Sequence, residues 1–529
     1  MRNGCKIAAA AVSLFFLLAV LIFPLSWLFA RGLSSSVDYS IWSDPFFWSV
    51  VRFTYWQAAC SAFLSCVLGT TAAFLYSDHV FPARKLLWHL SLVCFSLPTI
   101  VVVLSFTGFF GRSGLMNSAL AALGIDPFIQ VYGWVGILGA HVFYNFPLFL
   151  KSVGSALEQM DRTEEMAALS LGASRLQCLM LITFPKIWPV LKSCFFLAFL
   201  LCSSSFLVVL ILGASPKFTT LEVAIYEATK IEFDIPLAVR LALVQLVISG
   251  IVYFLFLRQS TLFVTLRPAG APFIRIYHSS KKMQNSLLIT GLLLVVGVLA
   301  GGPLIALVQS GVRGVFYLGR EFLPTLTTTV LLASLVGVLA TAIGISLAYC
   351  EKHVNRFGIG RWLAYLANIP LSVSTILLSV ALMLAYPAVH LKLRGSLLAI
   401  AVVQSTIALP LAFRILHEGF CRIGDELYWA AASAGASPFQ VLCDIELPLL
   451  KGPMFLSFLL AASFSIGEIG AVIMFLSEKI STVPLWIYRA MSQYRFEEAY
   501  GAAVVLFFFT LLMYVAAGFL ERKLYGSRS

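Results

Sequence analysis

Few residues inside the apolar stretches of this 529-residue chain could do chemistry. Glu468 lies in the run SFSIGEIGAV, and His141 and Asn145 share another apolar run. A carboxyl or imidazole group inside a membrane could handle a proton or an ion, whereas Asn and His also serve as hydrogen-bond partners between helices. We therefore treat these three side chains as candidates for a pathway or a gate.

Patterns typical of enzymes are missing from the sequence. It has no HExxH zinc pattern and no nucleophile elbow, and it lacks the GxxxxGK[ST] loop whose backbone and Lys hold the phosphates of ATP. We expect no catalytic residue, no bound metal and no cofactor held by this chain. If ATP and Mg²⁺ provide the energy, another polypeptide must hydrolyse the ATP.

Composition sets the class of protein that must position these residues. With 60% hydrophobic and 11% charged residues, the chain is predicted to be an all-α polytopic membrane protein. Its net charge of +12 is spread over loops and does not form a nucleic-acid-binding arm. The ten scattered cysteines indicate neither disulfides nor a metal site.

Apolar runs of about 20 residues predict twelve transmembrane helices, six in each half of the chain. The run 7–30 is longer than the apolar part of a signal peptide, so we interpret it as the first span. The predicted spans are 7–30, 51–75, 86–110, 131–152, 190–213, 238–258, 286–309, 325–349, 362–387, 396–416, 452–476 and 499–520. An even number of spans per half makes the two halves a parallel repeat.

Loop charges predict the orientation. The linker 259–285 contains Lys and Arg but no Asp or Glu, whereas loop 214–237 contains both signs. Positive loops face the cytoplasm. The linker and both termini are therefore predicted to be cytoplasmic.

Prolines occur in corresponding spans of the two halves. Pro98 and Pro370 fall in the third and ninth spans, and Pro147 and Pro410 fall in the fourth and tenth. A proline inside a span frees a backbone carbonyl and permits a bend, which is tolerated beside a cavity or a neighbouring helix. These positions predict paired interruptions near a central pathway, with simple packing kinks as the alternative.

The segment Thr163–Pro185 occurs again as Glu426–Pro448, 263 residues further along the chain. Each copy predicts a short helix, a break at Gly172 or Gly435 with positive φ, and a second helix. The second helix would begin with a capping box, formed by Ser174 and Gln177 in the first copy and by Ser437 and Gln440 in the second. Both copies are predicted to face the cytoplasm.

This repeated pattern resembles the cytoplasmic EAA loop of importer-type ABC transporter permeases, which docks into a groove on the ATPase subunit. The residues that carry the resemblance, with their close neighbours, are Glu165, Ala167, Ala168, Gly172, Ala173, Ile182 and Pro185 in the first copy and Ala430, Ala431, Gly435, Ala436, Ile445, Leu447 and Pro448 in the second. The first position of the pattern holds Met166 and Trp429 instead of Glu.

The resemblance implies the binding-protein-dependent (MetI-like) permease fold, present twice in one fused chain. The first repeat would cover 1–258 with its loop at 158–189, and the second would cover 286–529 with its loop at 418–451. Such a permease lies in the bacterial inner membrane between an ATPase dimer and an extracytoplasmic substrate-binding protein. Glu468 lies in a Gly-Glu-x-Gly-Ala run that permeases with different substrates share, which favours a structural or gating role.

The stretches 44–65 and 219–234 are similar to corresponding stretches of fused thiamine or thiamine pyrophosphate permeases, and ferric-iron permeases have the same layout. Thiamine is the favoured substrate and ferric iron the alternative. An ion-coupled secondary carrier is a lower alternative, because Glu468 alone is thin support for a coupling site. The outer stretches ending in Tyr226 and Tyr488 could dock a binding protein or form an interfacial aromatic belt.

Overall fold

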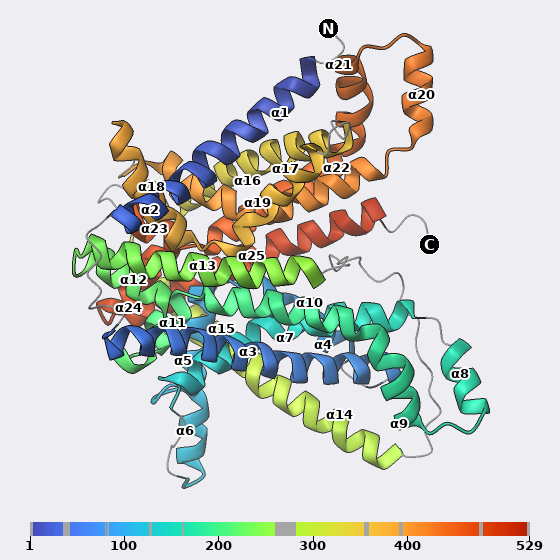
Figure 1. Ribbon diagram of the computed structural model, residues 1–529. Helices are drawn as coiled ribbons and strands as arrows, with labels where there is room; N and C mark the ends of the chain where they lie inside the picture. Colours follow the sequence, from blue (N-terminus) through green and yellow to red (C-terminus); the bar gives the residue numbers. More distant parts are fainter. Residues whose placement is uncertain are drawn as a thin grey trace.

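The computed structural model of the chain consists of helices, and no strand occurs among the residues that it describes. These residues are 4–34, 43–79, 81, 84–125, 130–160, 163–259, 282–353, 359–390, 395–475 and 480–525. The predicted basic linker lies almost entirely outside these ranges. The arrangement in Figure 1 confirms the predicted all-α class.

Helices of the first repeat follow the predicted spans, with several breaks. They are α1 (Gly4–Phe16), α2 (Phe23–Ser34), α3 (Pro45–Asp78), α4 (Arg84–Ser96), α5 (Thr99–Phe110), α6 (Leu115–Ala122), α7 (Trp134–Gln159), α8 (Thr163–Ser170), α9 (Arg175–Cys178), α10 (Phe184–Ser203), α11 (Leu207–Leu212), α12 (Leu221–Lys230) and α13 (Ile235–Gln259). π-Helical segments connect α1 to α2 and α9 to α10, and a 3-10 turn precedes α12.

The second repeat follows the same order. Its helices are α14 (Lys282–Val296), α15 (Gly302–Gly314), α16 (Phe322–His353), α17 (Ile359–Asn368), α18 (Thr375–Ala385), α19 (Leu397–Cys421), α20 (Asp425–Ser433), α21 (Pro438–Gln440), α22 (Leu447–Gly467), α23 (Gly470–Met474), α24 (Val483–Ser492) and α25 (Phe496–Tyr525). π-Helical segments again connect α14 to α15 and α21 to α22, at the positions that correspond to those of the first repeat.

Ten helical segments of the described residues are long and apolar enough to cross a membrane. The number rises to eleven if the pair Tyr365–Ser372 and Thr375–Ala385, bent by 104°, counts as one span. The predicted span 131–152 corresponds to α7, a 26-residue helix with His141 and Asn145 among its apolar residues. The polytopic class is confirmed, and the number twelve remains a prediction.

The first span of each repeat packs against the opposite repeat (Figure 1). Helix α1 lies on α16, and α2 lies on α18 and on α13 of its own repeat. Helix α15 lies on α5 as well as on α25 of its own repeat. Three hydrogen bonds join the first span to the second repeat. The Ser13 hydroxyl donates to the Ser346 hydroxyl at 3.0 Å, the Ser346 hydroxyl donates to the Ala9 carbonyl at 2.9 Å, and the Tyr386 hydroxyl donates to the Ala19 carbonyl at 3.0 Å. The sequence repeats are therefore interlocked in space.

Only one pair of the four prolines interrupts its span. Pro98 stands between α4 and α5, and Pro370 lies in the 3-10 turn between α17 and α18. Pro147 and Pro410 lie inside the continuous helices α7 and α19, so the prediction that they interrupt their spans was wrong. Both helices are packed on several sides, and neighbouring helices in a bundle compensate for the backbone bond that a proline removes.

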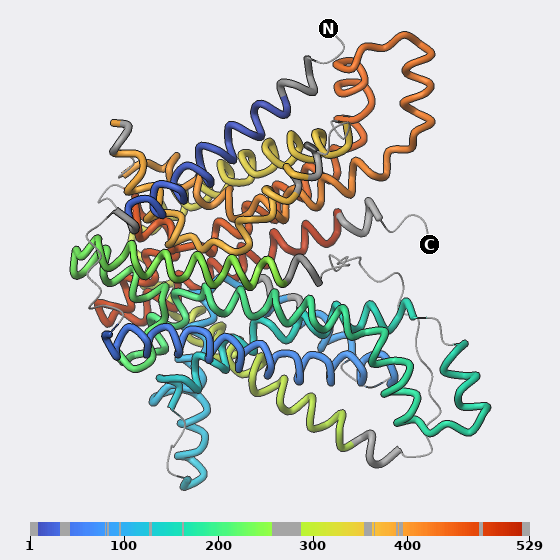
Figure 2. The backbone as a smooth tube through the Cα atoms, in the orientation of Figure 1, coloured from blue at the N-terminus to red at the C-terminus, as the bar shows by residue number. Residues whose placement is uncertain are grey.

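The two repeated loops lie at the same end of the molecule. In Figure 2 the loop of the first repeat, in teal, lies at the lower right, and that of the second, in orange, lies at the upper right. Helix α1 begins and α25 ends at this end, while α12 and α24 lie at the opposite end. This placement agrees with the predicted topology, in which loops and termini share one side of the membrane.

Close contact between α15 and α25 depends on glycine. A Cβ added to Gly314 would meet backbone atoms of Glu497 and Gly501, and backbone atoms cannot move aside as a flexible side chain can. We expect Gly314→Ala to lower the free energy of unfolding by about 1–3 kcal/mol, the usual cost of overpacking. Thermal unfolding of the variant in detergent would measure this loss of stability. Gly291→Ala on α14 is the matched control, because an added Cβ there has no neighbour within 4 Å; equal unfolding temperatures for both variants would contradict the prediction.

Candidate functional site

The repeated loop of the first half has the predicted conformation. Helix α8 ends before Gly172, whose φ is +89°. Ser174 and Gln177 then form a complete capping box at the start of α9, in which each side chain accepts from the other residue's backbone N–H. The helix, break and second helix are confirmed.

The loop of the second half repeats this geometry. Gly435 follows α20 with a φ of +75°, and Ser437 and Gln440 form the second capping box. Pro438 occupies the start of α21, where its missing N–H costs no hydrogen bond. Two segments so far apart in sequence therefore adopt one local structure, which indicates one shared task.

Both loops expose apolar side chains. Leu171 is 89% exposed beside Gly172, and Trp429 is 69% exposed on α20. Among the residues predicted for coupling, Ala167, Gly172, Pro185, Ala430, Gly435 and Pro448 are exposed, Glu165, Ala168, Ala173, Ile182, Ala436, Ile445 and Leu447 are half-buried, and Ala431 is buried. Exposed apolar surface of this kind is typical of sites that contact another protein or a membrane.

A hydrogen bond ties each loop helix to the π-helical segment that follows it. In the first loop the Thr183 hydroxyl donates to Oε1 of Glu165 at 2.5 Å. In the second loop the Tyr428 hydroxyl donates to Oε1 of Glu446 at 2.7 Å. Glu165 corresponds to Tyr428 and Thr183 to Glu446 at the separation of 263 residues, so donor and acceptor have exchanged places between the repeats.

The second loop is also anchored to α16. Glu446 is 1% exposed, and its Oε1 lies 2.6 Å from Nε2 of His353 at the end of α16. Burial, and then the Glu446 carboxylate, raise the pKa of the Tyr428 phenol far above its usual range, so the phenol remains a donor at any physiological pH. Lys352 lies over the Tyr428 ring and donates to the Phe420 carbonyl at 2.6 Å. Hydrogen bonds thus join the loop, the π-helical segment and the end of α16.

The sequence interpretation missed Thr183, Tyr428, Glu446 and His353. A signal for three of them existed, because Thr183, Tyr428 and Glu446 all fall inside the two repeated segments and pair at the same separation as the glycines. A search for complementary donors and acceptors at aligned positions, in addition to identical residues, would have found them.

Glu468 lies in the break between α22 and α23. Its Oε1 accepts from the backbone N–H of Gly470 at 2.5 Å, and its own carbonyl accepts from Nε2 of Gln404 at 3.3 Å. The Ser465 hydroxyl donates to Oε1 of the same Gln404 at 2.6 Å. The Glu468 carboxyl group therefore accepts from the first residue of α23 within the break, and its role in a gate stays a prediction.

His141 and Asn145 belong to a separate cluster in the first repeat. Nδ1 of His141 lies 3.2 Å from the Ser61 hydroxyl, and Nδ2 of Asn145 lies 3.3 Å from the Cys202 sulfur. At the separation of 263 residues, His141 corresponds to Gln404 and Cys202 to Ser465. Each repeat therefore has its own buried polar cluster at this position, and the structure does not bring His141 or Asn145 into contact with Glu468.

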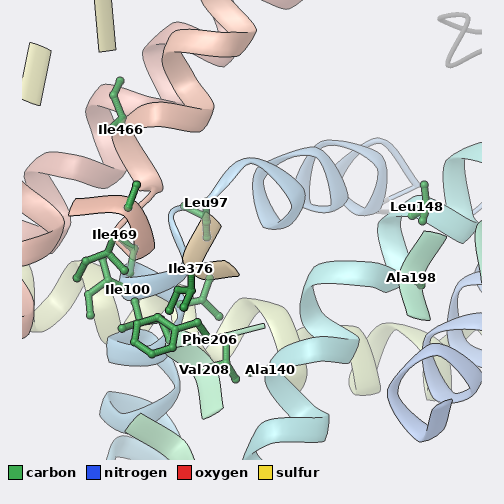
Figure 3. Packing of buried hydrophobic residues seen from close by; sticks show 14 of the residues in the cluster. Leu97, Ile100, Ala140, Leu148, Ala198, Phe206, Val208, Ile376, Ile466 and Ile469 are labelled. Carbon is green, nitrogen blue, oxygen red and sulfur yellow. The ribbon is translucent and has the colours of Figure 1, made fainter. Parts of the chain in front are cut away.

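Apolar residues of both repeats pack together at the break between α4 and α5 and at the break between α22 and α23. Figure 3 shows Ile100 and Phe206 of the first repeat gathered with Ile376 of the second, with Ile469 beside them, and all four are buried. A Cβ added to Gly467 would lie 3.1 Å from the Cα of Pro98, so the two breaks are in direct contact. We call the group formed by Leu97, Ile100, Phe206, Ile376 and Ile469 the apolar seal.

The outer helices α12 and α24 carry the two tyrosines predicted for docking. Burial raises the pKa of the Tyr226 phenol to about 12, and the neighbouring Tyr488 phenol contributes to the shift. Both tyrosines are half-buried, so they connect the two outer helices as well as contributing to the outer surface.

Residues 65–261 and 340–525 match one protein family, described as "Binding-protein-dependent transport system inner membrane component". Over 473 residues the chain is 29% identical to the "Thiamine transport system permease protein ThiP" of Brucella abortus (strain 2308), with 88% of this chain and 86% of that protein covered. The protein of the same name from Escherichia coli (strain K12) is 27% identical over 482 residues, covering 90% and 89%.

Among solved structures, the chain is similar to one from the "Crystal structure of bacterial alginate ABC transporter in complex with alginate pentasaccharide-bound periplasmic protein". The TM-score is 0.44 at 15% identity, and the alignment covers 49% of this chain and 95% of that one.

Proposed function

The chain belongs to the family of binding-protein-dependent transport system inner membrane components, and from that membership we propose that it is the permease subunit of an ATP-driven importer for thiamine or thiamine pyrophosphate. The observation that carries the proposal is the duplication of one loop, each copy followed by a helix that runs to the central breaks. Relatives aligned over most of their length are thiamine permeases, which favours thiamine over the ferric-iron alternative.

A separate ATPase dimer would bind the two loops. Each loop presents exposed apolar residues and a glycine turn with positive φ, and the two copies at one end of the molecule suit a partner that also has two copies. The partner would bind ATP and Mg²⁺, since this chain has no phosphate loop. We place the loops and both termini in the cytoplasm of a bacterium, with the chain in the inner membrane.

The hydrogen bonds at the loops could transmit a movement of the ATPase to the apolar seal. When the ATPase dimer closes, it would pull α8 and α20 together. The bonds of Glu165 to Thr183 and of Tyr428 to Glu446 would transmit that pull to α10 and α22. Helix α22 ends at the break that holds Glu468 beside the apolar seal, so the two repeats would rock about the seal and open it alternately to each side.

A substrate-binding protein would deliver the substrate at the opposite end. Helices α12 and α24 lie there, one from each repeat, joined through Tyr226 and Tyr488. A partner seated across both helices would sense whether the repeats are together or apart. Docking of the binding protein on the outside and ATP hydrolysis on the inside would thereby favour the same rocking movement of the two repeats.

Uptake of labelled thiamine tests the function directly. Cells that lack this chain should take up nanomolar thiamine at least about tenfold more slowly than cells that have it, and the chain supplied in trans should restore uptake. Excess unlabelled thiamine should compete, whereas excess ferric chelate should not. Unchanged thiamine uptake in the deletion strain would refute the substrate assignment, and labelled ferric iron would then be measured in the same cells.

A further inference from the structure

Glu222 is a charged residue type in the interior of the protein. It lies on α12, in a stretch that reads in the sequence as an outer loop, yet its exposed fraction is 0%. Helix α12 packs against α3 and α13 of its own repeat and against α18 of the other repeat. Glu222 therefore lies where the two repeats meet.

The contacts of this carboxyl group leave part of it unsatisfied. Nε2 of Gln245, on α13, donates to Oε1 of Glu222, and the Ser374 side chain of the opposite repeat is also a hydrogen-bond partner of this carboxyl group. Burial raises the pKa of Glu222 to about 8, so a neighbouring positive charge would favour its ionised form. Within the part of the chain that the structure describes, Oε2 of Glu222 has no partner with hydrogen-bond geometry, and neither has Oε1 of Gln245. A buried polar atom without a partner is costly, so its presence calls for an explanation.

A second buried carboxylate comes from the opposite repeat. Ser374, beside Glu222, is followed in the chain by Thr375, whose hydroxyl lies near the carboxyl group of Glu468. Among the described residues, no basic side chain forms an ion pair with Glu222 or Glu468. Two acidic groups, one from each repeat, thus flank the start of α18 without a cation from the protein.

The fold itself does not require an acidic residue at this position. Helices α12 and α24 begin in the same way: the Leu221 N–H donates to Thr54 at 2.9 Å, and the Val483 N–H donates to Thr329 at 2.8 Å. Leu221 and Val483 are 262 residues apart, and at this separation Pro484 corresponds to Glu222. The positive-φ residues Phe233 and Tyr494 are 261 residues apart, and at this separation Leu506 corresponds to Gln245. The second repeat makes the equivalent contacts, of α24 and α25 with α5, without any acidic group there.

We propose that Glu222 and Glu468 form an acidic subsite, which ionises around the positively charged group of an organic cation as that group passes between the repeats. This inference rests on the proposed function: the thiazolium ring of thiamine carries a permanent positive charge and has no N–H to donate, so it needs a negative neighbour more than a hydrogen-bond acceptor. Gln245 and Ser374 are positioning residues that hold the Glu222 carboxyl group in place. Rocking of the repeats separates α12 from α18 and exposes the subsite.

Two substitutions of Glu222 separate a charge role from a packing role. Glu222→Gln preserves the size of the side chain and removes the charge, whereas Glu222→Asp preserves the charge and shortens the side chain. If charge matters, the Gln variant should take up labelled thiamine at least about tenfold more slowly than wild type and the Asp variant within about threefold of it. If packing and the Gln245 contact matter, the order should reverse, because Asp leaves a gap and Gln does not.

The assay uses the full chain in vesicles with its ATPase and binding protein, and it reports thiamine taken up per ATP hydrolysed together with the unfolding temperature. Glu232→Gln is the matched control, because Glu232 is exposed on the same outer segment and should leave uptake unchanged. Uptake by the Gln variant equal to that of wild type, or the reversed order, would overturn the subsite. No thiamine uptake by the wild-type chain would instead overturn the proposed function, so the two failures are distinguishable.

Discussion

Gly435→Val is expected to reduce the ATPase that copurifies with the permease by about tenfold, while the chain still inserts into the membrane. Gly435 has a φ of +75°, and a Cβ there would have no neighbour within 4 Å. The whole effect therefore comes from the backbone: a left-handed conformation costs a non-glycine residue about 1–2 kcal/mol, and 1.4 kcal/mol is a factor of ten in binding. Affinity purification from membranes, followed by quantification of both subunits, would measure it.

Two controls isolate the backbone effect. Gly435→Asn should retain most of the ATPase, because Asn tolerates positive φ. Gly424→Val makes the same substitution at the start of α20, where φ is −64° and an added Cβ also has no neighbour, and it should bind the ATPase normally. If Gly435→Val copurified with normal amounts of ATPase, the coupling role of the loop would be refuted.

Glu446→Ala is expected to impair both stability and coupling. The substitution leaves the Tyr428 hydroxyl and Nε2 of His353 without their acceptor in a mostly buried position. Each unsatisfied buried group costs about 1–3 kcal/mol, so the unfolding temperature should fall clearly. ATP hydrolysis should also lose much of its stimulation by the loaded binding protein, because α20 is no longer tied to α22.

The first repeat provides the comparison for this prediction. Glu165→Ala removes the corresponding bond, but Glu165 is half-buried and, among the described residues, has no partner like His353. Its effect on the unfolding temperature should therefore be smaller. Tyr428→Phe removes one donor and retains the contact of His353 with Glu446. Its unfolding temperature should therefore fall between those of Glu446→Ala and Glu165→Ala. A Glu446→Ala protein with wild-type unfolding temperature and wild-type coupling would show that the anchoring contacts have no role.

Local structure was predictable wherever neighbouring residues in the sequence determine it. A glycine after a run of helix-forming residues and a Ser with Gln three residues later predicted both loops, and both capping boxes are present. Pro147 misled the prediction because a proline lowers helix propensity locally, whereas packing of α7 on α3, α4 and α10 stabilises the continuous helix.

Contacts between distant segments could not be predicted in this way. Glu222 stands among Glu227, Glu232, Asp234 and lysines, so its stretch has the composition of an exposed loop. Only the folded chain shows that α12 turns this one carboxylate inward against α18. The exchange of α1 and α15 between the repeats likewise has no local signal, because an apolar span is equally compatible with either neighbour.

The contact of α1 with the second repeat delays the packing of α1 until α16 has been synthesised. The hydrogen bond between Ser13 and Ser346 joins residues 333 positions apart. At about 5–20 residues per second of synthesis, α1 leaves the ribosome many seconds before α16 exists. During that interval the face of α1 that will contact α16 must be covered by lipid or by a chaperone, and a truncated first repeat would keep it uncovered. Quality control in the cell should therefore recognise an unfinished or split chain by its first span.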